Sequence, residues 1–193
     1  MGQYYRPVSL DTMEHLSPYA FDNGAKLMEH SYIGNNYVAA VELLLIEGGR
    51  WDKHRIVWAG DYADGEKLDS PLFHKKEHSA EDAEGYNLYE LLDDSKELSF
   101  LITASPTDHI YLVNFDKKEY VDKTKVPNIA GWSEPTQINP LPLLTAEGNG
   151  RGGGDFRGED PNELIGSWAR NRIGLRNAIP EGFTEIIFDL SED

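Results

Sequence analysis

Several stretches of the chain carry hydrophobic patterns that predict regular elements. Apolar residues dominate residues 111–115 and 119–121, and the polar residues 116–118 between them predict a β-hairpin. Residues 8–16 are expected to form a similar hairpin, with Pro7 keeping its first strand at a sheet edge or at the strand's beginning. A helix is predicted from Asn35-Asn36, which can cap it, to Gly48-Gly49. Its apolar residues share one stripe: Tyr37, Val38, Val41, Leu44 and Leu45.

Further segments have strand-like patterns. Residues 55–59 and 172–175 are strand candidates, and residues 183–190 alternate apolar and polar side chains except at Ile186-Ile187, so this last segment is expected to close a sheet. Residues 143–146 are also a strand candidate. Extended chain is predicted in place of a helix just before them, because prolines 135, 140 and 142 remove helical hydrogen bonds.

Three sequence blocks recur in the same order, which suggests an internal duplication. Residues 8–16 match residues 113–121 in the pattern V-x-[LF]-D-x-x-E-[HY]-[LV]. Residues 43–48 match 143–148, and residues 51–56 match 168–173 as W-x-[KR]-x-R-I. The predicted architecture is one α+β domain over residues 1–193, with a mostly antiparallel sheet built from two related halves and few helices. The half-repeats cover residues 1–60 and 98–193, and an acidic connector containing a helix, residues 61–97, joins them.

Composition excludes several classes of protein. The 193 residues include no cysteine, so the chain has no disulfide, thiolate nucleophile or thiol-ligated metal. The longest apolar stretch, residues 38–46, is interrupted by Glu42, and the first residues lack the layout of a signal peptide. We therefore expect a cytoplasmic protein that does not insert into a membrane.

Negative charge is concentrated in one region. Lys and Arg number 18 against 34 Asp and Glu, a net charge of −16 that argues against direct binding to nucleic acid. Residues 61–97 hold twelve of these acids and four lysines. One interpretation is solubility; the other is a surface that engages a basic partner. Its candidate contact residues are Asp61, Asp64, Glu66, Asp69, Glu81, Asp82 and Glu84.

A second hypothesis is a small-ligand site between the halves. The glycine-rich residues 148–158 could offer backbone N–H groups to a phosphate, with Arg151 or Arg157 as the charge partner. The repeated pairs Trp51 with Arg55 and Trp168 with Arg172 could face a shared cleft and bind a nucleotide-like ligand. The alternative is that the tryptophans are core residues and that the arginines pair with Glu47 and Glu147.

Two metal hypotheses rest on short patterns. His74, Glu77 and His78 fit H-x-x-E-H, in which two histidines bind zinc and the glutamate acts as a base, with Glu147 as a formal third ligand. The charged flanks of this motif favour a solvated helix instead. Asp61, Asp64 and Glu66 could bind Ca²⁺ or Mg²⁺, or simply form a polar turn. We expect no cofactor.

Four motifs carry a resemblance to a known group of sequences: M-G-Q-Y-Y at residues 1–5, residues 26–36, R-I-V-W-A-G-D-Y-A-D at residues 55–64, and G-N-G-R-G-G-G-D at residues 148–155. Here the chain resembles a group of uncharacterised bacterial and phage-associated proteins. The resemblance implies no activity or catalytic residue. Its phage association favours an inhibitor of a host defence enzyme, whose acidic stretch would act as a decoy for a nucleic-acid channel, by analogy with anti-CRISPR proteins.

The leading prediction is therefore a non-enzymatic acidic binding protein that engages a basic, nucleic-acid-handling partner. The alternatives are the small-ligand protein and the zinc hydrolase.

Overall fold

The computed structural model describes residues 2–66, 86–100, 106, 108–129, 136–148 and 163–190. In chain order the elements are β1 (Tyr5–Ser9), β2 (Glu14–His15), the 3-10 helix η1 (Pro18–Phe21), α1 (Leu27–His30), α2 (Asn36–Leu45), β3 (His54–Gly60), α3 (Leu88–Leu91), the 3-10 helix η3 (Leu92–Asp94), β4 (Lys96–Glu97), β5 (Tyr111–Asn114), β6 (Glu119–Asp122), the 3-10 helix η4 (Lys123–Lys125), β7 (Asn128–Ile129), β8 (Thr136–Gln137), α4 (Pro140–Leu144), β9 (Ala146–Glu147), β10 (Arg172–Arg176) and β11 (Thr184–Glu185).

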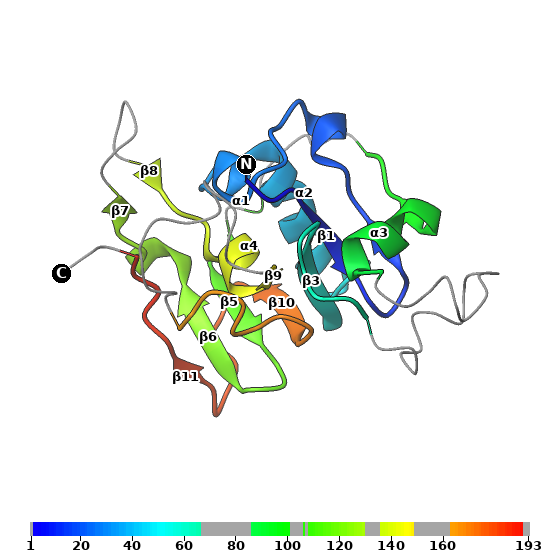
Figure 1. Ribbon diagram of the computed structural model, residues 1–193. Coiled ribbons are helices and arrows are strands. Elements are labelled where there is room, and N and C mark those ends of the chain that lie inside the picture. The colour runs from blue at the N-terminus through cyan, green and yellow to red at the C-terminus, as the bar shows by residue number, and fades with distance from the viewer. Residues whose placement is uncertain are drawn as a thin grey trace.

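Within the described residues, one nine-stranded sheet organises the molecule (Figure 1). Its strands follow the order β11-β6-β5-β10-β3-β1-β2-β4, and β9 adds to β3. The pairs β11–β6, β2–β4 and β3–β9 are parallel and the other pairs are antiparallel. The predicted α+β class with a mostly antiparallel sheet is confirmed. Of residues 183–190, only β11 is a strand, and it forms one edge of the sheet.

The recurring sequence blocks occupy matching places in this sheet. Each half has a hairpin whose first strand also pairs with the central strand of that half, which is β3 or β10. The registers agree, since one valine in each half has equivalent partners: Val8 pairs with His15 and Val57, and Val113 pairs with Tyr120 and Gly174. Both hairpin turns contain a residue with positive φ, Met13 at 50° and Lys118 at 55°. The descent of the halves from one duplicated unit stays a prediction.

The two central strands meet at the middle of the sheet. Arg55 of β3 pairs directly with Arg172 of β10 in antiparallel register. The hydrogen bonds around this pair are reciprocal: Lys53 N donates to Ile173 O at 3.0 Å, and Arg170 N donates to Ile56 O at 2.9 Å. The halves are therefore related by an approximate two-fold rotation that passes between Arg55 and Arg172.

The repeated tryptophans anchor the hairpins to the core. Trp51 and Trp168 are fully buried, and their indole N–H groups donate to Glu14 at 3.2 Å and to Glu119 at 2.8 Å. Glu14 also accepts from Arg50, and the hydrogen bond from that guanidinium is the main reason that the pKa of Glu14 falls to about 2. A buried indole needs an acceptor for its N–H, and a hairpin carboxylate supplies one in each half.

In both halves a helix precedes the central strand in the sequence: α2 precedes β3, and α4 precedes β10. The predicted first helix is confirmed as α2, although it ends at Leu45, before the predicted end at Gly48-Gly49. Its cap is Asn35, whose Oδ1 accepts from Tyr37 N and Val38 N. The prediction of extended chain in the second half is wrong, because α4 occupies Pro140–Leu144 with Pro140 in its first turn. Proline is tolerated there since the first helical N–H groups have no partner inside the helix. The strand predicted for residues 143–146 is also wrong, because residues 143–144 belong to α4 and β9 shares only Ala146 with the predicted strand.

Pro7 also differs from its prediction. It lies within β1, which is an inner strand between β2 and β3 and not an edge. Pro7 O still accepts from Leu16 N at 3.3 Å, but proline has no N–H to return that bond. The hydroxyl of the buried Tyr37 donates to Leu16 O at 3.1 Å instead. A side chain from α2 thus satisfies the carbonyl that the proline leaves without a strand partner.

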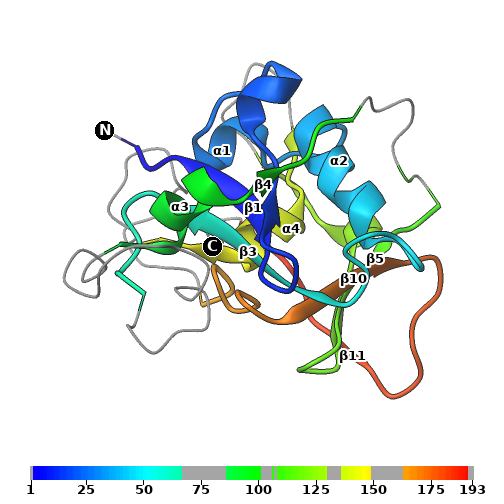
Figure 2. The same ribbon diagram turned by 90° about the vertical axis from the view of Figure 1, so that its right-hand side faces the viewer.

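Two apolar clusters cover the sheet. The larger one holds α2, α4 and the buried tryptophans, and it continues across both halves. The smaller one lies between α3 and the β1–β3 strands, where Leu88 and Leu92 pack against Val8 and Val57. Figure 2 shows α3 lying across this part of the sheet. The first half is thereby sandwiched between helices.

The second half fills the matching space differently. Gly174 stands where the first half has Val57, and a Cβ at Gly174 would lie 2.8 Å from the Phe115 ring and 2.9 Å from the Arg176 guanidinium. That guanidinium lies 4.9 Å from the centroid of the Phe115 ring. Glycine is therefore required here to admit a stacked arginine and phenylalanine.

Replacing Gly174 with valine should destabilise the fold by about 1–3 kcal/mol, the usual cost of overpacking. Urea unfolding of Gly174→Val measures this change. In a Phe115→Ala background the same substitution should cost less, because the clashing ring is gone. An equal cost in both backgrounds would contradict the packing account.

A buried histidine connects α1 to the central strand. His30 is fully buried and lies between Gly24 O, 3.0 Å from Nδ1, and the Trp58 indole N–H, which donates to Nε2 at 2.9 Å. These partners suit a neutral imidazole with its proton on Nδ1. Burial, which disfavours the charged form, lowers the pKa of His30 from 6.5 to about 4.

Stability should fall as the pH drops from about 6.5 towards 4. In this window the unfolded chain binds a proton at His30 that the folded chain does not, and the accumulated loss is roughly 3 kcal/mol. Urea unfolding at successive pH values measures this loss. His30→Gln, whose amide can keep both hydrogen bonds, should show a shallower slope in this window; parallel profiles would assign the loss to other groups.

Candidate interaction surface

Three of the predicted partner-binding residues lie in the described part of the chain. Asp61, Asp64 and Glu66 follow β3, whereas Asp69, Glu81, Asp82 and Glu84 lie outside the described residues. The chain is described again from Tyr86, just before α3. Residues 61–66 and 86–97, the second range with α3, η3 and β4, therefore form the described part of the predicted acidic connector.

Asp61 ties these segments together. Its backbone N–H donates to Tyr4 O at 3.0 Å, and its Oδ1 accepts from Tyr4 N at 2.9 Å. Its own carbonyl accepts from Asn87 Nδ2 at 2.9 Å, and Asn87 is the residue that caps α3. Asp61 thus fixes the start of β1, the turn after β3 and the start of α3 relative to one another.

Exposed tyrosines gather around this aspartate. The exposed fractions are 44% for Tyr4 and Tyr62 and 37% for Tyr86, although large aromatic side chains are usually more buried. Tyr86 is held near by its carbonyl, which accepts from Glu66 N at 2.8 Å. We call this region the tyrosine–carboxylate surface: Tyr4, Asp61, Tyr62, Asp64, Tyr86 and Tyr89.

An arginine stands at the edge of the tyrosine–carboxylate surface. The Arg6 guanidinium lies 4.3 Å from the centroid of the Tyr89 ring, and its Nη1 is 3.1 Å from Asp93 Oδ1. Burial raises the pKa of the half-buried Tyr89 hydroxyl. The surface therefore already contains one guanidinium that is stacked on a tyrosine and paired with a carboxylate.

Glu66 has a different role from Asp61 and Asp64. Its side chain is 5% exposed and is paired with Arg170, whose guanidinium also contacts Glu147 at 2.6 and 2.7 Å. The hydrogen bonds that Arg170 donates to Glu147 are the main cause of its raised pKa. The Glu66 carboxylate is thus bound by Arg170 within the fold, and this ion pair fixes the end of residues 61–66 against the second half.

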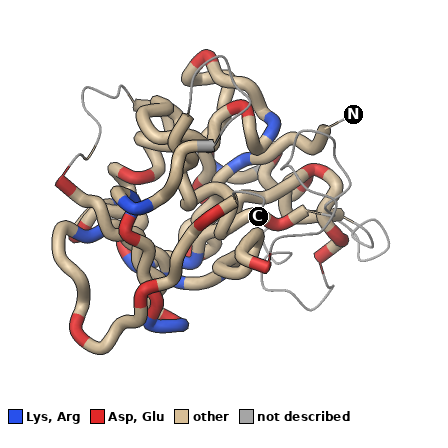
Figure 3. The backbone as a smooth tube through the Cα atoms, turned by 90° about the vertical axis from the view of Figure 1, so that its left-hand side faces the viewer, with Lys and Arg blue, Asp and Glu red and all other residues tan. Residues whose placement is uncertain are grey.

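All arginines of the described residues are in ion pairs. The pairs are Arg6 with Asp93, Arg50 with Glu14, Arg55 with Asp11, Arg170 with Glu66 and Glu147, Arg172 with Asp116, and Arg176 with Asp52. Figure 3 shows acidic positions spread around the backbone, with basic positions among them. The arginines are therefore largely neutralised by the fold, which leaves the excess of carboxylates to set the surface charge.

The residues of the small-ligand hypothesis are only partly brought together. Arg55 and Arg172 are neighbours, but each is paired with a hairpin aspartate, Asp11 or Asp116, and not with Glu47 or Glu147. The faces of Trp51 and Trp168 are buried in the core. Arg151 and Arg157 lie outside the described residues.

The zinc motif of His74, Glu77 and His78 also lies outside the described residues. Its formal third ligand, Glu147, is engaged with Arg170. No group of three or more His, Asp or Glu side chains suited to a metal ion occurs in the described part of the chain.

The tyrosines of this surface are not among the residues that the sequence predicts as a site. A signal for them exists, because Tyr4 lies in the motif M-G-Q-Y-Y and Tyr62 lies between Asp61 and Asp64 in the motif G-D-Y-A-D. Comparison with protein-family models, curated proteins and solved structures found no match.

None of the helices in the described ranges is long and apolar enough to cross a membrane.

Replacing Arg170 with alanine should lower stability by about 1–3 kcal/mol, because it leaves the buried Glu66 carboxylate without its partner. The matched control is Arg172→Ala, which breaks a more exposed pair and should cost less than about 1 kcal/mol. Urea unfolding of both variants checks the difference. Equal losses would show that the pairing of Glu66 adds nothing beyond an exposed ion pair.

Proposed function

We propose that this chain is a non-enzymatic binding protein whose tyrosine–carboxylate surface engages a basic partner. The observation that carries the proposal is that exposed Tyr4, Tyr62 and Tyr86 lie on segments that meet at Asp61. The turn that holds Asp61 also carries the exposed Asp64. Scattered exposed apolar residues need no explanation, but aromatic residues gathered on one surface are typical of recognition surfaces.

This combination suits arginine and lysine side chains. A carboxylate forms charge-assisted hydrogen bonds with a guanidinium, and a tyrosine ring offers a face on which the same group can stack. Arg6, stacked on Tyr89 and paired with Asp93, is an example of this arrangement inside the protein. Rigid aromatic side chains also contribute much of the binding energy in protein interfaces.

The net charge of the chain favours one class of partner, namely proteins with basic surfaces. A net charge of −16 repels nucleic acid and attracts proteins that bind it, because such proteins carry basic surfaces. The resemblance to phage-associated sequences extends the proposal: the partner is a nucleic-acid-handling enzyme of host defence, and the acidic surface occupies its nucleic-acid channel. This extension rests on the resemblance and on charge.

An arginine-rich peptide is a probe for this chemistry. Asp61→Asn with Asp64→Asn removes two charges from the surface, and the amide oxygen introduced at position 61 can still accept from Tyr4 N. The control, Glu47→Gln with Glu181→Gln, removes two exposed charges elsewhere. Titration calorimetry at low salt should show weaker binding of the peptide to the first variant than to the control.

Binding to the wild type should also weaken as salt is added, because exposed charges are screened. Equal affinities of the two charge variants would mean that only overall charge matters, and the tyrosine–carboxylate surface would then be rejected as the site.

A further inference from the structure

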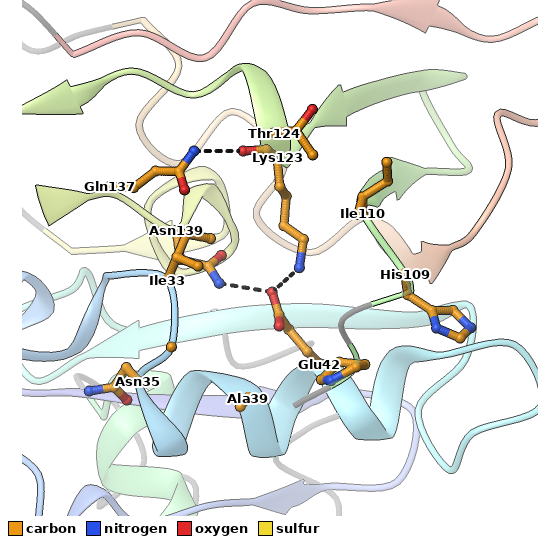
Figure 4. A pocket seen from close by; sticks show the side chains of 12 residues that line it. Ile33, Asn35, Ala39, Glu42, His109, Ile110, Lys123, Thr124, Gln137 and Asn139 are labelled. Carbon is orange, nitrogen blue, oxygen red and sulfur yellow. Dashed lines mark hydrogen bonds and ion pairs between the residues drawn. The ribbon is translucent and has the colours of Figure 1, made fainter. Parts of the chain in front are cut away.

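A cavity of about 340 Å³ lies between the halves, away from the tyrosine–carboxylate surface. Its walls come from the start and middle of α2, the chain before β5, η4, β8 and the cap of α4 (Figure 4). Apolar contacts come from Ile33, Ala39 and Ile110, while Glu42, Lys123 and Asn139 supply polar groups. This mixture of an apolar lining with a few converging polar groups is typical of small-molecule sites.

An ion pair forms the polar part of the wall. Lys123 Nζ lies 2.7 Å from Glu42 Oε1, and the two side chains are 11% and 7% exposed. The same Oε1 accepts from Asn139 Nδ2 at 2.8 Å. Removing two charges from water costs several kcal/mol each in effective terms, so a buried pair is a poor means of adding stability. Its position on the wall of a cavity indicates another use.

The fold holds these groups in place. Asn139 Oδ1 accepts from Leu141 N at 3.1 Å and so caps α4, while its amide reaches Glu42. Gln137 Nε2 donates to Lys123 O at 3.1 Å and to Val126 O at 2.8 Å, which fixes the backbone that carries the lysine. Figure 4 shows Glu42 extending from α2 towards Lys123 and Asn139. A ligand would therefore meet groups that are already oriented.

The chemistry of the pair defines the class of ligand. Both hydrogen bonds to Glu42 use Oε1, so Oε2 can accept from a ligand, and the ammonium of Lys123 has three donors, of which one is directed at Glu42. The cavity thus presents an acceptor beside a donor with no net charge. A phosphate would meet the Glu42 carboxylate, which disfavours anions.

We propose that this cavity binds a small molecule of no net charge that carries a hydrogen-bond donor next to an acceptor on an apolar body. Two sources share that chemistry: an α-amino acid, with its ammonium at Glu42 and its carboxylate at Lys123, and a planar amide edge such as that of a pyrimidine base. The volume is at the small end of the range for ligand pockets, about 300–1,000 Å³, which favours a metabolite over a peptide.

Ligand-observed NMR on the full chain tests the proposal. The probes are L-leucine and L-phenylalanine for the first source, uracil and thymine for the second, and inorganic phosphate as the anion. We expect one neutral class to bind and phosphate not to compete. Glu42→Gln with Lys123→Met removes both charges together and should weaken that binding about tenfold or more, a loss of at least about 1.4 kcal/mol.

The matched control is Glu185→Gln with Lys125→Met, which removes a more exposed ion pair of 2.6 Å and should leave binding unchanged. If the Glu42 and Lys123 variant does not fold, Ile33→Trp serves instead, because Ile33 lines the cavity, is 39% exposed and is not part of the ion pair. The proposal is overturned if no neutral probe binds, if phosphate displaces the bound probe, or if the cavity variants bind as well as the control.

Discussion

The antiparallel pairing of β3 with β10 is the contact on which the two-half architecture depends. It places Arg55 directly opposite Arg172, and like charges in that position repel each other. Asp11 and Asp116, from the hairpin turn of each half, compensate by pairing with the guanidinium and accepting the backbone N–H of the same arginine. One carboxylate thus neutralises the charge and locks its hairpin to the central strand.

The halves also exchange chain segments around this centre. Ala146, which follows α4, pairs in parallel with Trp58 of β3, and Ile46, which follows α2, bridges in parallel to Leu175 of β10. Each central strand therefore obtains a neighbour from the other half. Neither half alone would satisfy the backbone groups of its central strand, and this explains why the core runs through both halves without interruption.

Both proposed binding regions lie where the halves differ. The tyrosine–carboxylate surface borders α3, whose cap Asn87 is fixed by Asp61. The cavity wall joins Glu42, from the ten-residue α2, to Lys123 and Asn139 of the second half. A repeated scaffold of strands supplies rigidity, and the differences between its halves supply distinct surfaces.

Local sequence patterns determined much of the scaffold. The hairpins, the capped α2 and the central strands follow from apolar periodicity and turn residues, which act over a few neighbouring positions. The matching blocks also placed equivalent residues in the two halves. The pair Asn139-Pro140 is itself a local signal for the start of a helix, but the three nearby prolines obscure it. No local pattern shows that Pro7 lies inside the sheet, because that depends on the hydroxyl of the distant Tyr37.

For the candidate sites, what the sequence determines and what only the tertiary structure decides are more clearly separated. Composition alone identified the negative excess and the acids Asp61 and Asp64, since charge can be counted along a chain. Only the tertiary structure decided that Glu66 is occupied by Arg170, that the repeated tryptophans are core, and that Glu42 meets Lys123 beside a cavity. Glu66 and Arg170 are 104 positions apart and Glu42 and Lys123 are 81, and no local periodicity encodes which distant charges meet once the halves pack together.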